Sequence, residues 1–535
     1  MLLVPDRSQW HDPATPGNRG ASSFAGWPDA QRGNRVPSSS HIQRRVRFAV
    51  ASVLLASVGA VIPGPTAAGA AVAGAPQAYI VLYSQGASSA NAAQQVQRAG
   101  GTVVANYPQI GVVIARSAGA GFATSVRSAS GVESAVATGA FGAGLAPAQT
   151  DLGPLPGSAP ASDTDTLSGL QWDMRQIHAP QAHAITGGSP SVIVGDIDTG
   201  LDFTHPDLAP NYDATRSADC SSGAPSPLLK GNDVDGHGTH TAGTIAAAAN
   251  GSGIVGVAPN VKIAGIKSSN DDGFFFPEMV VCSYVWVAEH GINVTNNSYF
   301  ADPWLFNCKN DAGQRAIWEA ERRAIRYAQS KGTVVVAAEG NESTDLSHPR
   351  VDVISPDFPP GSEQVRQITN ACAVVPVEVP GVVGVTATGN LQLKSFYSSY
   401  GTSTADVAAP GGDSRLQRTA ASPNGRVLST WPTSALCTRA VIDPGTGAKY
   451  CYLQGTSMAS PHVAGVAALV ISQTGKTGGA AAAAVQQATN PLPCPQDGLY
   501  AAFPQNSGQP QHCSGGIAHN SFYGAGETDA LKAVR

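Results

Sequence analysis

The chain contains Gly455-Thr456-Ser457-Met458-Ala459-Ser460-Pro461-His462, and an apolar run from Val463 to Ile471 follows at once. A Gly-Thr pair permits a tight turn, and the apolar run predicts a buried helix whose start Ser457 occupies. The first N–H groups of a helix have no partner within it, and the positive end of the helix dipole lies beside them. A serine at this position is suited to nucleophilic attack, because such N–H groups stabilise an oxyanion.

Two further motifs lie upstream and supply the partners that a nucleophilic serine needs. Asp198-Thr199-Gly200 ends an apolar strand, and His237-Gly238-Thr239-His240 precedes a run of small apolar residues. A hydroxyl is a poor nucleophile until a base takes its proton, and His237 is the candidate base. Asp198 is the candidate that holds this imidazole in one tautomer. His240, one turn further along the predicted helix, is interpreted as structural support.

The chain order Asp, His, Ser is that of subtilisin. With all three motifs present, residues 77–535 resemble the subtilisin-like serine proteases. The resemblance implies a catalytic triad of Asp198, His237 and Ser457 and an acyl-enzyme intermediate, with no cofactor for catalysis. It also implies an oxyanion hole made by the Ser457 N–H and the side chain of Asn341, which ends the apolar strand Val335–Ala338.

Composition and charge limit the class of protein. At 535 residues we expect two folded units plus tails. Charged residues are 13%, hydrophobic residues 42%, and 60 Gly and 38 Pro are present, which favours a compact, loop-rich extracellular enzyme. A net charge of −5, with no basic stripe after residue 50, argues against nucleic acid as a partner. We expect a monomer that acts on proteins or peptides.

The N-terminal region predicts secretion. Residues 1–40 are rich in Pro, Gly, Ser and Arg and are predicted to be disordered. Residues 41–75 combine a basic segment with an apolar core, Phe48 to Ile62, which is typical of a signal peptide. The core is shorter than the roughly 20 residues of a membrane span, so the mature form is expected to be secreted and free of the membrane. Arg47 interrupts a twin-arginine pattern, which favours the ordinary secretory route; a start codon assigned too far upstream would explain the late signal.

Residues 77–140 predict a small α+β domain in the order βαββαβ. The expected strands are 78–83, 101–105, 111–115 and 133–137, and the expected helices are 90–99 and 122–129. By the resemblance and by its position, this domain is expected to be an inhibitory propeptide, and so a partner of the active site. Residues 141–168 read as a linker. We expect the first self-cleavage between Phe141 and Pro147, with Leu145 preferred over Phe141 as the residue before the cut.

Residues 169–535 predict an α/β peptidase domain with a mainly parallel sheet covered by helices. The expected strands are 192–197, 261–267, 292–298 and 332–338, and the expected helices are 277–290 and 312–330. In sheets of this kind the ligand crevice lies at the carboxyl ends of the strands. Asp198, Ser298 and Asn341 all follow such ends.

All eight cysteines lie beyond residue 200, which favours disulfides in an oxidising compartment. Zinc is the alternative, but the sequence has no CxxC pair. Close spacing favours Cys437–Cys451 and Cys494–Cys513. Cys282–Cys308 is a weaker prediction, and Cys220–Cys372 follows only by elimination.

Two segments are expected to bind substrate. Where the family usually has Ser-Leu-Gly-Gly, this chain has Ser298-Tyr299-Phe300-Ala301, so bulkier residues replace glycines along the primary specificity pocket. The segment 270–276, with Gly273 and Phe274, falls where family members pair with extended substrate backbone. Its three phenylalanines, with Tyr299, suggest an aromatic subsite, and core filling is an equal alternative.

Two acidic residues also depart from the family pattern. Glu339 stands where a small residue is common; it is interpreted as buried and paired, with a basic-residue preference of the pocket as the alternative. Asp196 replaces an apolar residue and shares a strand face with Asp198. A hydrogen-bonded core residue is the preferred interpretation of Asp196.

The resemblance implies a structural calcium site. Asp207 and Asn250 align with family ligands, and the carbonyls of Ala248, Ser252 and Ile254 would complete a cage of hard oxygens. The alternative is a carboxylate at a helix N-terminus and an asparagine in a turn.

The leading hypothesis is a secreted serine endopeptidase that matures by cutting off its own propeptide. The altered pocket leaves a dedicated processing peptidase, for instance a leader-peptide peptidase with narrow specificity, as an alternative. A catalytically silent binding module is a further alternative, against which the complete triad argues.

Overall fold

The computed structural model describes residues 75–138 and 163–535, all within one compact unit of the chain. The predicted extension 1–40, nearly all of the predicted signal peptide and the predicted cleavage window around Leu145 lie outside the described residues. No helix in the described ranges is both long and apolar enough to cross a membrane.

The N-terminal domain has the predicted order βαββαβ. Its elements are β1 (Gln77–Tyr83), α1 (Ala92–Arg98), β2 (Thr102–Tyr107), β3 (Val112–Ser117), α2 (Phe122–Arg127) and β4 (Val132–Ala137). The antiparallel sheet has the order β2-β3-β1-β4. Alternate residues of β1 point to opposite faces: Tyr79 and Val81 pack against α1 and α2, whereas Ile80 and Leu82 belong to a cluster shared with α6 (Pro277–Glu289) and α7 (Ala312–Ser330).

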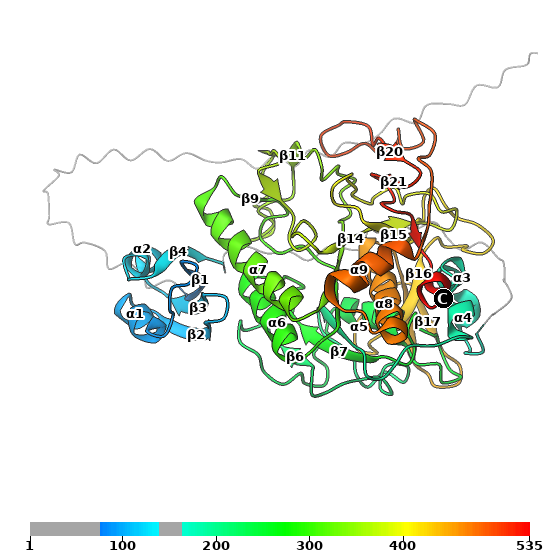
Figure 1. Cartoon of the computed structure of the whole chain (residues 1–535), viewed down its shortest axis with the longest axis horizontal. Helices are drawn as coiled ribbons and strands as arrows, with labels where there is room; N and C mark the ends of the chain where they lie inside the picture. The colour runs from blue at the N-terminus through cyan, green and yellow to red at the C-terminus, as the bar shows by residue number, and fades with distance from the viewer. Residues whose placement is uncertain (1–74, 139–162) are drawn as a thin grey trace, which may run out of the picture. The chain divides into compact units, whose positions relative to one another are not determined.

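Residues 163–535, here called the C-terminal region, are built on a nine-stranded sheet in the order β19-β22-β15-β14-β10-β8-β5-β7-β6. Strands β14, β15, β7 and β6 of this sheet are labelled in Figure 1. Every neighbouring pair is parallel except β19 and β22. In sheet order the strands are Thr489–Asn490, Glu527–Thr528, Val407–Pro410, Val383–Thr388, Val334–Ala338, Val294–Asn297, Ile193–Asp198, Lys262–Lys267 and Ala218–Asp219. The predicted mainly parallel sheet is therefore confirmed, and most predicted element ends lie within two residues of the observed ones.

Helices cover both faces of this sheet, so its strands are apolar on both sides. On β10, Val335 and Ala337 pack towards α6 and α7, whereas Val334 and Val336 pack towards α5 (His237–Ala246) and α8 (Thr456–Thr474). The other helices of this region are α3 (Trp172–Gln176), α4 (Ala179–His183), α9 (Gly478–Gln487), α10 (Ala530–Ala533) and a 3₁₀ turn at Ser168–Leu170. β5 alternates in the same way, which places Asp196 and Asp198 on the α5 and α8 side.

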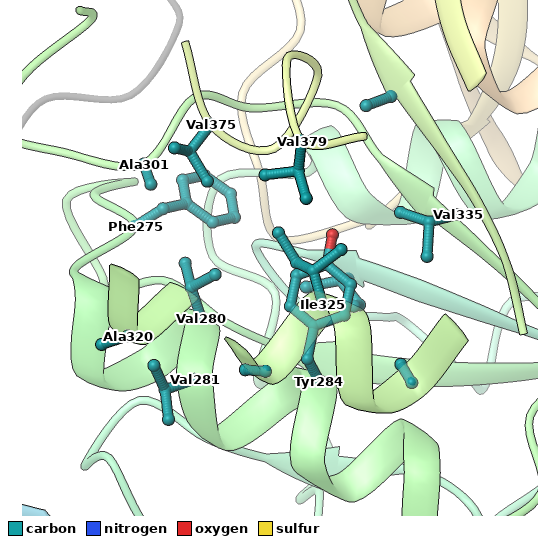
Figure 2. Packing of buried hydrophobic residues seen from close by; sticks show 14 of the residues in the cluster. Phe275, Val280, Val281, Tyr284, Ala301, Ala320, Ile325, Val335, Val375 and Val379 are labelled. Atoms are coloured by element: carbon teal, nitrogen blue, oxygen red, sulfur yellow. The ribbon is translucent and has the colours of Figure 1, made fainter. Parts of the chain in front are cut away.

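Figure 2 shows the packing on the side of α6 and α7. Tyr284 of α6 lies beside Ile325 of α7, and Phe275 lies close to Ala301 and Val375. Close packing of these side chains holds in place the carboxyl ends of the strands, where the polar residues described below lie.

Short strands outside the main sheet belong to long connections. They are β9 (Asn307–Cys308) with β13 (Cys372–Ala373), β11 (Val351–Asp352) with β12 (Arg366–Gln367), β16 (Val427–Trp431) with β18 (Lys449–Leu453) and β17 (Ala440–Ile442), and β20 (Gly515–Gly516) with β21 (His519–Asn520). Residues 163–168, predicted to be linker, pack on the rest of the C-terminal region instead. Leu167 N donates to Gly253 O (2.6 Å), and Leu167 and Ser168 are buried.

All eight cysteines form disulfides, and two of the four predicted pairs are confirmed: Cys437–Cys451 and Cys494–Cys513. The other two predictions are wrong, because the bonds are Cys220–Cys282 and Cys308–Cys372. Cys308 and Cys372 face each other as register partners on the antiparallel strands β9 and β13. Strand pairing over 64 residues of sequence therefore decides this bond, and proximity along the chain does not.

Candidate active site

The residues of the predicted triad come from three elements on one side of the sheet. Asp198 ends β5, His237 begins α5 and Ser457 lies in the first turn of α8. Gly236 makes the turn into α5 with φ +100°, and a side-chain carbon there would lie 2.5 Å from the Trp431 ring. Only glycine fits this position, so the entry of His237 into its helix is fixed by sterics.

Asp198 and His237 form a buried ion pair. His237 Nδ1 lies 2.7 Å from Asp198 Oδ1, and Thr199 N donates to the same oxygen at 2.7 Å. Asp198 is fully buried, and its Oδ2 has no hydrogen-bond partner among the described residues. Because Asp198 accepts a hydrogen bond from Nδ1–H, the neutral imidazole carries its proton on Nδ1. Nε2 is then the nitrogen that can accept a proton from another group.

This environment makes His237 a strong base. Burial lowers the pKa of His237, but the charge and hydrogen bond of Asp198 outweigh burial, and Asp235 and Asp196 add to the effect. The pKa of His237 rises to about 9 as a result.

Ser457 lies at the N-terminal end of α8 and is 3% exposed. Its Oγ donates to the carbonyl oxygen of Ser298 (3.3 Å), and Ser298 Oγ donates to the carbonyl oxygen of Ser457 (2.9 Å). No hydrogen bond of the described residues joins Ser457 Oγ to His237. The hydroxyl must give up its bond to Ser298 O before it can donate to the base, and catalytic hydrogen bonds often form only when substrate is bound.

Asn341 and the start of α8 supply two donors that face the same space. Asn341 Oδ1 accepts from Thr456 N (2.9 Å) and Thr456 Oγ1 (3.0 Å), which leaves the Nδ2 amide group pointing away from Thr456. A side-chain carbon built on Gly455 would lie 3.5 Å from Asn341 Nδ2 and 3.6 Å from Ser457 N. These two N–H donors converge beside the nucleophile, which is the arrangement that an oxyanion requires.

The sequence analysis missed two residues that orient this site. Thr456 fixes the amide of Asn341, and its only sequence signal is a hydroxyl next to Ser457. Asp233 is fully enclosed and accepts from Thr199 Oγ1 (2.9 Å), Gly236 N (2.8 Å) and Thr239 Oγ1 (2.6 Å). Its signal is an acidic residue four positions before His237.

His240 has the structural role that was predicted. Its Nε2 lies 3.0 Å from the carbonyl oxygen of Cys451, and burial lowers its pKa to about 3. The ring therefore stays neutral and ties α5 to β18.

The predicted substrate-binding residues Ser298, Tyr299, Phe300, Gly273 and Phe274 are all buried. The ring of Tyr299 stacks on Phe275 with centroids 4.3 Å apart, and Phe274 packs edge-on against Phe358 at 5.3 Å. These rings fill space against one another, so the structure gives the core-filling interpretation direct support. Their contact with a substrate stays a prediction.

Glu339 is 1% exposed and accepts from Thr404 Oγ1 (3.0 Å) through Oε2. Burial raises its pKa well above the usual range for a carboxyl. Its burial and its hydrogen bond to Thr404 support the structural interpretation of Glu339 and not a basic-residue preference of the pocket.

The predicted calcium donors surround a buried carboxylate. Asp207 Oδ1 accepts from Asn250 Nδ2 (3.3 Å), while Oδ2 accepts from Ile254 N (3.0 Å) and from Tyr450 Oη (2.8 Å). Asp165 Oδ2 accepts from Asn250 N (3.0 Å), so two carboxylates flank one asparagine. No lysine or arginine among the described residues pairs with either carboxylate.

The charge and oxygen chemistry of these residues fit a hard cation, with one change. Asn250 now turns its amide nitrogen towards Asp207, so it must rotate its amide by half a turn to offer an oxygen. Among the described residues, no group of three or more His, Cys, Asp or Glu side chains forms a metal site. A cation here would thus depend on Asp207, Asn250 and the carbonyls of Ala248, Ser252 and Ile254.

Residues 189–508 match the Subtilase family. The chain is 30% identical to the thermophilic serine proteinase of Bacillus sp. strain AK1 over 57% of this chain and 58% of that protein. It is 31% identical to the alkaline protease of Alkalihalobacillus alcalophilus over 58% and 62% of the two chains. Both relatives are thus matched over less than two thirds of their length. Thermitase of Thermoactinomyces vulgaris is 32% identical over 57% of this chain and 84% of that protein.

Two solved structures share the fold at 23% identity. One is the epidermin leader peptide processing serine protease EpiP from Staphylococcus aureus, with a TM-score of 0.61 over 86% of this chain and 98% of that one. The other is fervidolysin from Fervidobacterium pennivorans, described as a keratinolytic enzyme related to subtilisin, with a TM-score of 0.62 over 86% and 61%. At this identity the likeness concerns the fold alone.

The ion pair at this site predicts an unusual histidine titration. In nitrogen-15 NMR of the full chain, we expect the imidazole of His237 to lose its proton near pH 9. Asp198→Asn removes the charge that raises this pKa, and burial then lowers it below the ordinary value of about 6.5. A His237 signal that titrates below pH 7 in the unaltered protein would contradict the described electrostatics.

Proposed function

This chain belongs to the subtilase family, and we propose that it hydrolyses peptide bonds through a triad of Asp198, His237 and Ser457. The observation that carries the proposal is the buried 2.7 Å pair of His237 and Asp198 on the same side of the sheet as Ser457, at the start of α8. Asn341 Nδ2 and Ser457 N converge beside that serine and complete the set.

The geometry supports an acyl-enzyme route. Ser457 Oγ attacks the carbonyl carbon of the scissile bond while His237 Nε2 takes its proton, and Asp198 stabilises the imidazolium through Nδ1–H. The carbonyl oxygen becomes an oxyanion, to which Asn341 Nδ2 and Ser457 N donate. His237 then protonates the leaving amine, and a water molecule hydrolyses the ester on Ser457. This chemistry uses only groups of the chain, without a catalytic cofactor.

We propose that the enzyme is secreted and that residues 77–140 are its inhibitory propeptide. Four disulfides support an oxidising compartment. The N-terminal domain is held on the helices of the C-terminal region: Arg323 donates to Tyr83 O (2.8 Å) and pairs with Glu133 (3.3 Å), and Tyr107 Oη donates to Gly223 O (2.8 Å). These contacts hold the N-terminal domain against the rest of the protein, as an inhibitory propeptide would require. Its last strand, β4, ends four residues before the first residue of the predicted cleavage window.

A structural calcium ion at Asp207 and Asn250 is part of the proposal. Burial, with a smaller contribution from the nearby charge of Asp165, raises the pKa of Asp207 to about 6. A cation between these carboxylates would offset the cost of burying their charge and would fasten the segment at Asp165 to the loop at Asn250.

A dedicated processing peptidase with narrow specificity is the second candidate. It is favoured by Phe300 and Ala301, which take the place of two glycines along the specificity pocket; Ala301 is fully buried and donates to Val375 O (2.9 Å). A digest of a peptide library separates the two candidates, because a processing peptidase cuts few sequences.

Ser457→Ala should abolish peptide hydrolysis, because no other group of the site supplies the nucleophile. The full-length variant should remain an uncleaved precursor when purified. Ser472→Ala, which removes a hydroxyl near the far end of the same helix, is the control and should mature normally. Maturation of purified Ser457→Ala would exclude Ser457 as the nucleophile.

Asn341→Ala should lower kcat by about 10²–10³ and change KM little, because the lost donor acts on the oxyanion and not on bound substrate. The variant should retain a melting temperature close to that of the unaltered enzyme, since Thr456 stays bonded through Gly340 N. Equal losses in kcat and in folded fraction would point to a structural role for Asn341 instead.

N-terminal sequencing of the secreted protein should place the first cut between Phe141 and Pro147, with Leu145 preferred. Later trimming should stop before Asp163, because Asp165 and Leu167 are bonded to the loop at 250–253. A mature N-terminus before Tyr107 would show that residues 77–140 are not a removable propeptide.

Chelation should lower the melting temperature if a cation binds only the folded state. Protonated Asp207 cannot bind the ion, so the stabilisation by added Ca²⁺ should grow as the pH rises through about 6. Asp207→Ala should remove the response to Ca²⁺, and Asp202→Asn, a nearby carboxylate outside the site, should keep it. Identical melting curves with and without chelator would refute the calcium proposal.

A further inference from the structure

Asp196 is a buried carboxyl that the proposed mechanism does not use. It lies on β5, two residues before Asp198, and is 1% exposed. Its neighbour on the same strand face, Val194, packs into the apolar layer beneath α5 and α8. Burying a carboxyl in such a layer is costly unless it is hydrogen-bonded, so its partners explain why it is tolerated.

One arm of Asp196 reaches the helix that carries the base. Asp196 Oδ2 lies 2.7 Å from Thr241 Oγ1, one helical turn after His237 on α5. Thr241 Oγ1 also lies 3.0 Å from Gly238 O. The hydroxyl can therefore donate to either group. It stays hydrogen-bonded whether Asp196 Oδ2 accepts from it or, when protonated, donates to it.

The other arm reaches the helix that carries the nucleophile. Asn296 Nδ2 donates to Asp196 Oδ1 (2.9 Å) and to Ser298 Oγ (3.1 Å), and Asn296 Oδ1 accepts from Ser460 Oγ (2.7 Å). Ser460 lies one turn after Ser457 on α8, and Ser298 Oγ donates to the carbonyl oxygen of Ser457 (2.9 Å). Every polar atom of Asn296 is thus used in a link between Asp196 and the start of α8.

We propose that Asp196 is a positioning residue of this enzyme. Its two oxygens join α5 through Thr241 and α8 through Asn296, and so set the separation of His237 and Ser457. The inference rests on the proposed function of these two residues. A misplacement of about 1 Å at a catalytic pair can cost about 10²-fold in rate, so a network that fixes two helices to one strand acts on kcat.

An apolar side chain at position 196 would pack in the layer but break both arms at once. It would leave one N–H of Asn296 without a partner in a dry environment, and Thr241 would donate to Gly238 O and lose its link to β5. Asparagine, in contrast, preserves the network: its oxygen accepts from Asn296, and its NH₂ donates to Thr241, which then donates to Gly238 O.

The test compares Asp196→Val with Asp196→Asn in the full chain, with kcat and KM measured on the processed, active-site-titrated enzyme. Asp196→Val should lower kcat about 30- to 100-fold with KM within about threefold. Asp196→Asn should keep kcat within about threefold. If Asn at this position is as inactive as Val, the charge and not the network is required, and the proposal is wrong.

Glu527 provides the matched control. It is a fully buried carboxyl in the same sheet, bonded to Thr388, Gln392 and Gln176, none of which lies on α5 or α8. Glu527→Leu and Asp196→Val should both lower the melting temperature, but only Asp196→Val should lower kcat per active site. Equal kcat in the two variants would overturn the positioning role.

Two further variants keep the proposal testable if Asp196→Val does not fold. Thr241→Val cuts the arm to α5, and Asn296→Ala removes both routes to α8, through Ser460 and through Ser298. Each should lower kcat about tenfold, and the double variant about as much as Asp196→Val. Full kcat in both single variants would contradict the proposal, whereas an active Ser457→Ala would contradict the proposed function instead.

Discussion

A carboxylate with no contact to solvent, Asp198, imposes the main constraint on this structure. An isolated buried charge is unstable, so the fold must bring a cation to it, and the His237 imidazole 2.7 Å away is that cation. This requirement fixes where α5 begins, because the turn at Gly236 must point the His237 side chain towards Asp198. The high pKa of His237 follows from the same pairing, since the imidazolium is the form that the carboxylate stabilises.

The mainly parallel sheet makes this arrangement available at low cost. The carboxyl ends of β5, β8 and β10 meet at one edge, and Asp198, Ser298 and Asn341 follow those ends. Both faces of the sheet are covered by helices, and the polar groups lie at or close to the places where the strands stop. The N-terminus of α8 adds free N–H groups at the same edge. The positions of the proposed catalytic residues are thus set by the ends of the strands and the starts of the helices α5 and α8.

Much of this could be predicted from the sequence, for identifiable reasons. Strands and helices with long apolar periods were located closely, as with α7, whose bounds matched the prediction. The triad could be proposed because each of its residues stands in a motif with a distinctive local context, and its catalytic role stays a prediction. His240 and Glu339 were expected to be structural, and both are buried, with His240 bonded to Cys451 and Glu339 to Thr404.

Other features depended on contacts between distant segments. The pairing of Cys308 with Cys372 is set by the register of β9 and β13, which spacing along the chain does not reveal. The packing of residues 163–168 on the loop at 250–253 was hidden for the same reason. The orientation of the Asn250 amide and the three-element network around Asp196 depend on angles and distances of side chains. A single sequence shows that such residues are unusual, but not what they touch.

The central claim is that Ser457 is the nucleophile activated by the His237–Asp198 pair. The most direct measurement is peptide mapping by mass spectrometry after the mature enzyme has reacted with a fluorophosphonate. The account predicts one adduct, on Ser457, whose formation accelerates as His237 loses its proton towards pH 9 and is lost in His237→Ala. An adduct on another serine, or a rate of labelling at Ser457 that is unchanged in His237→Ala, would contradict it.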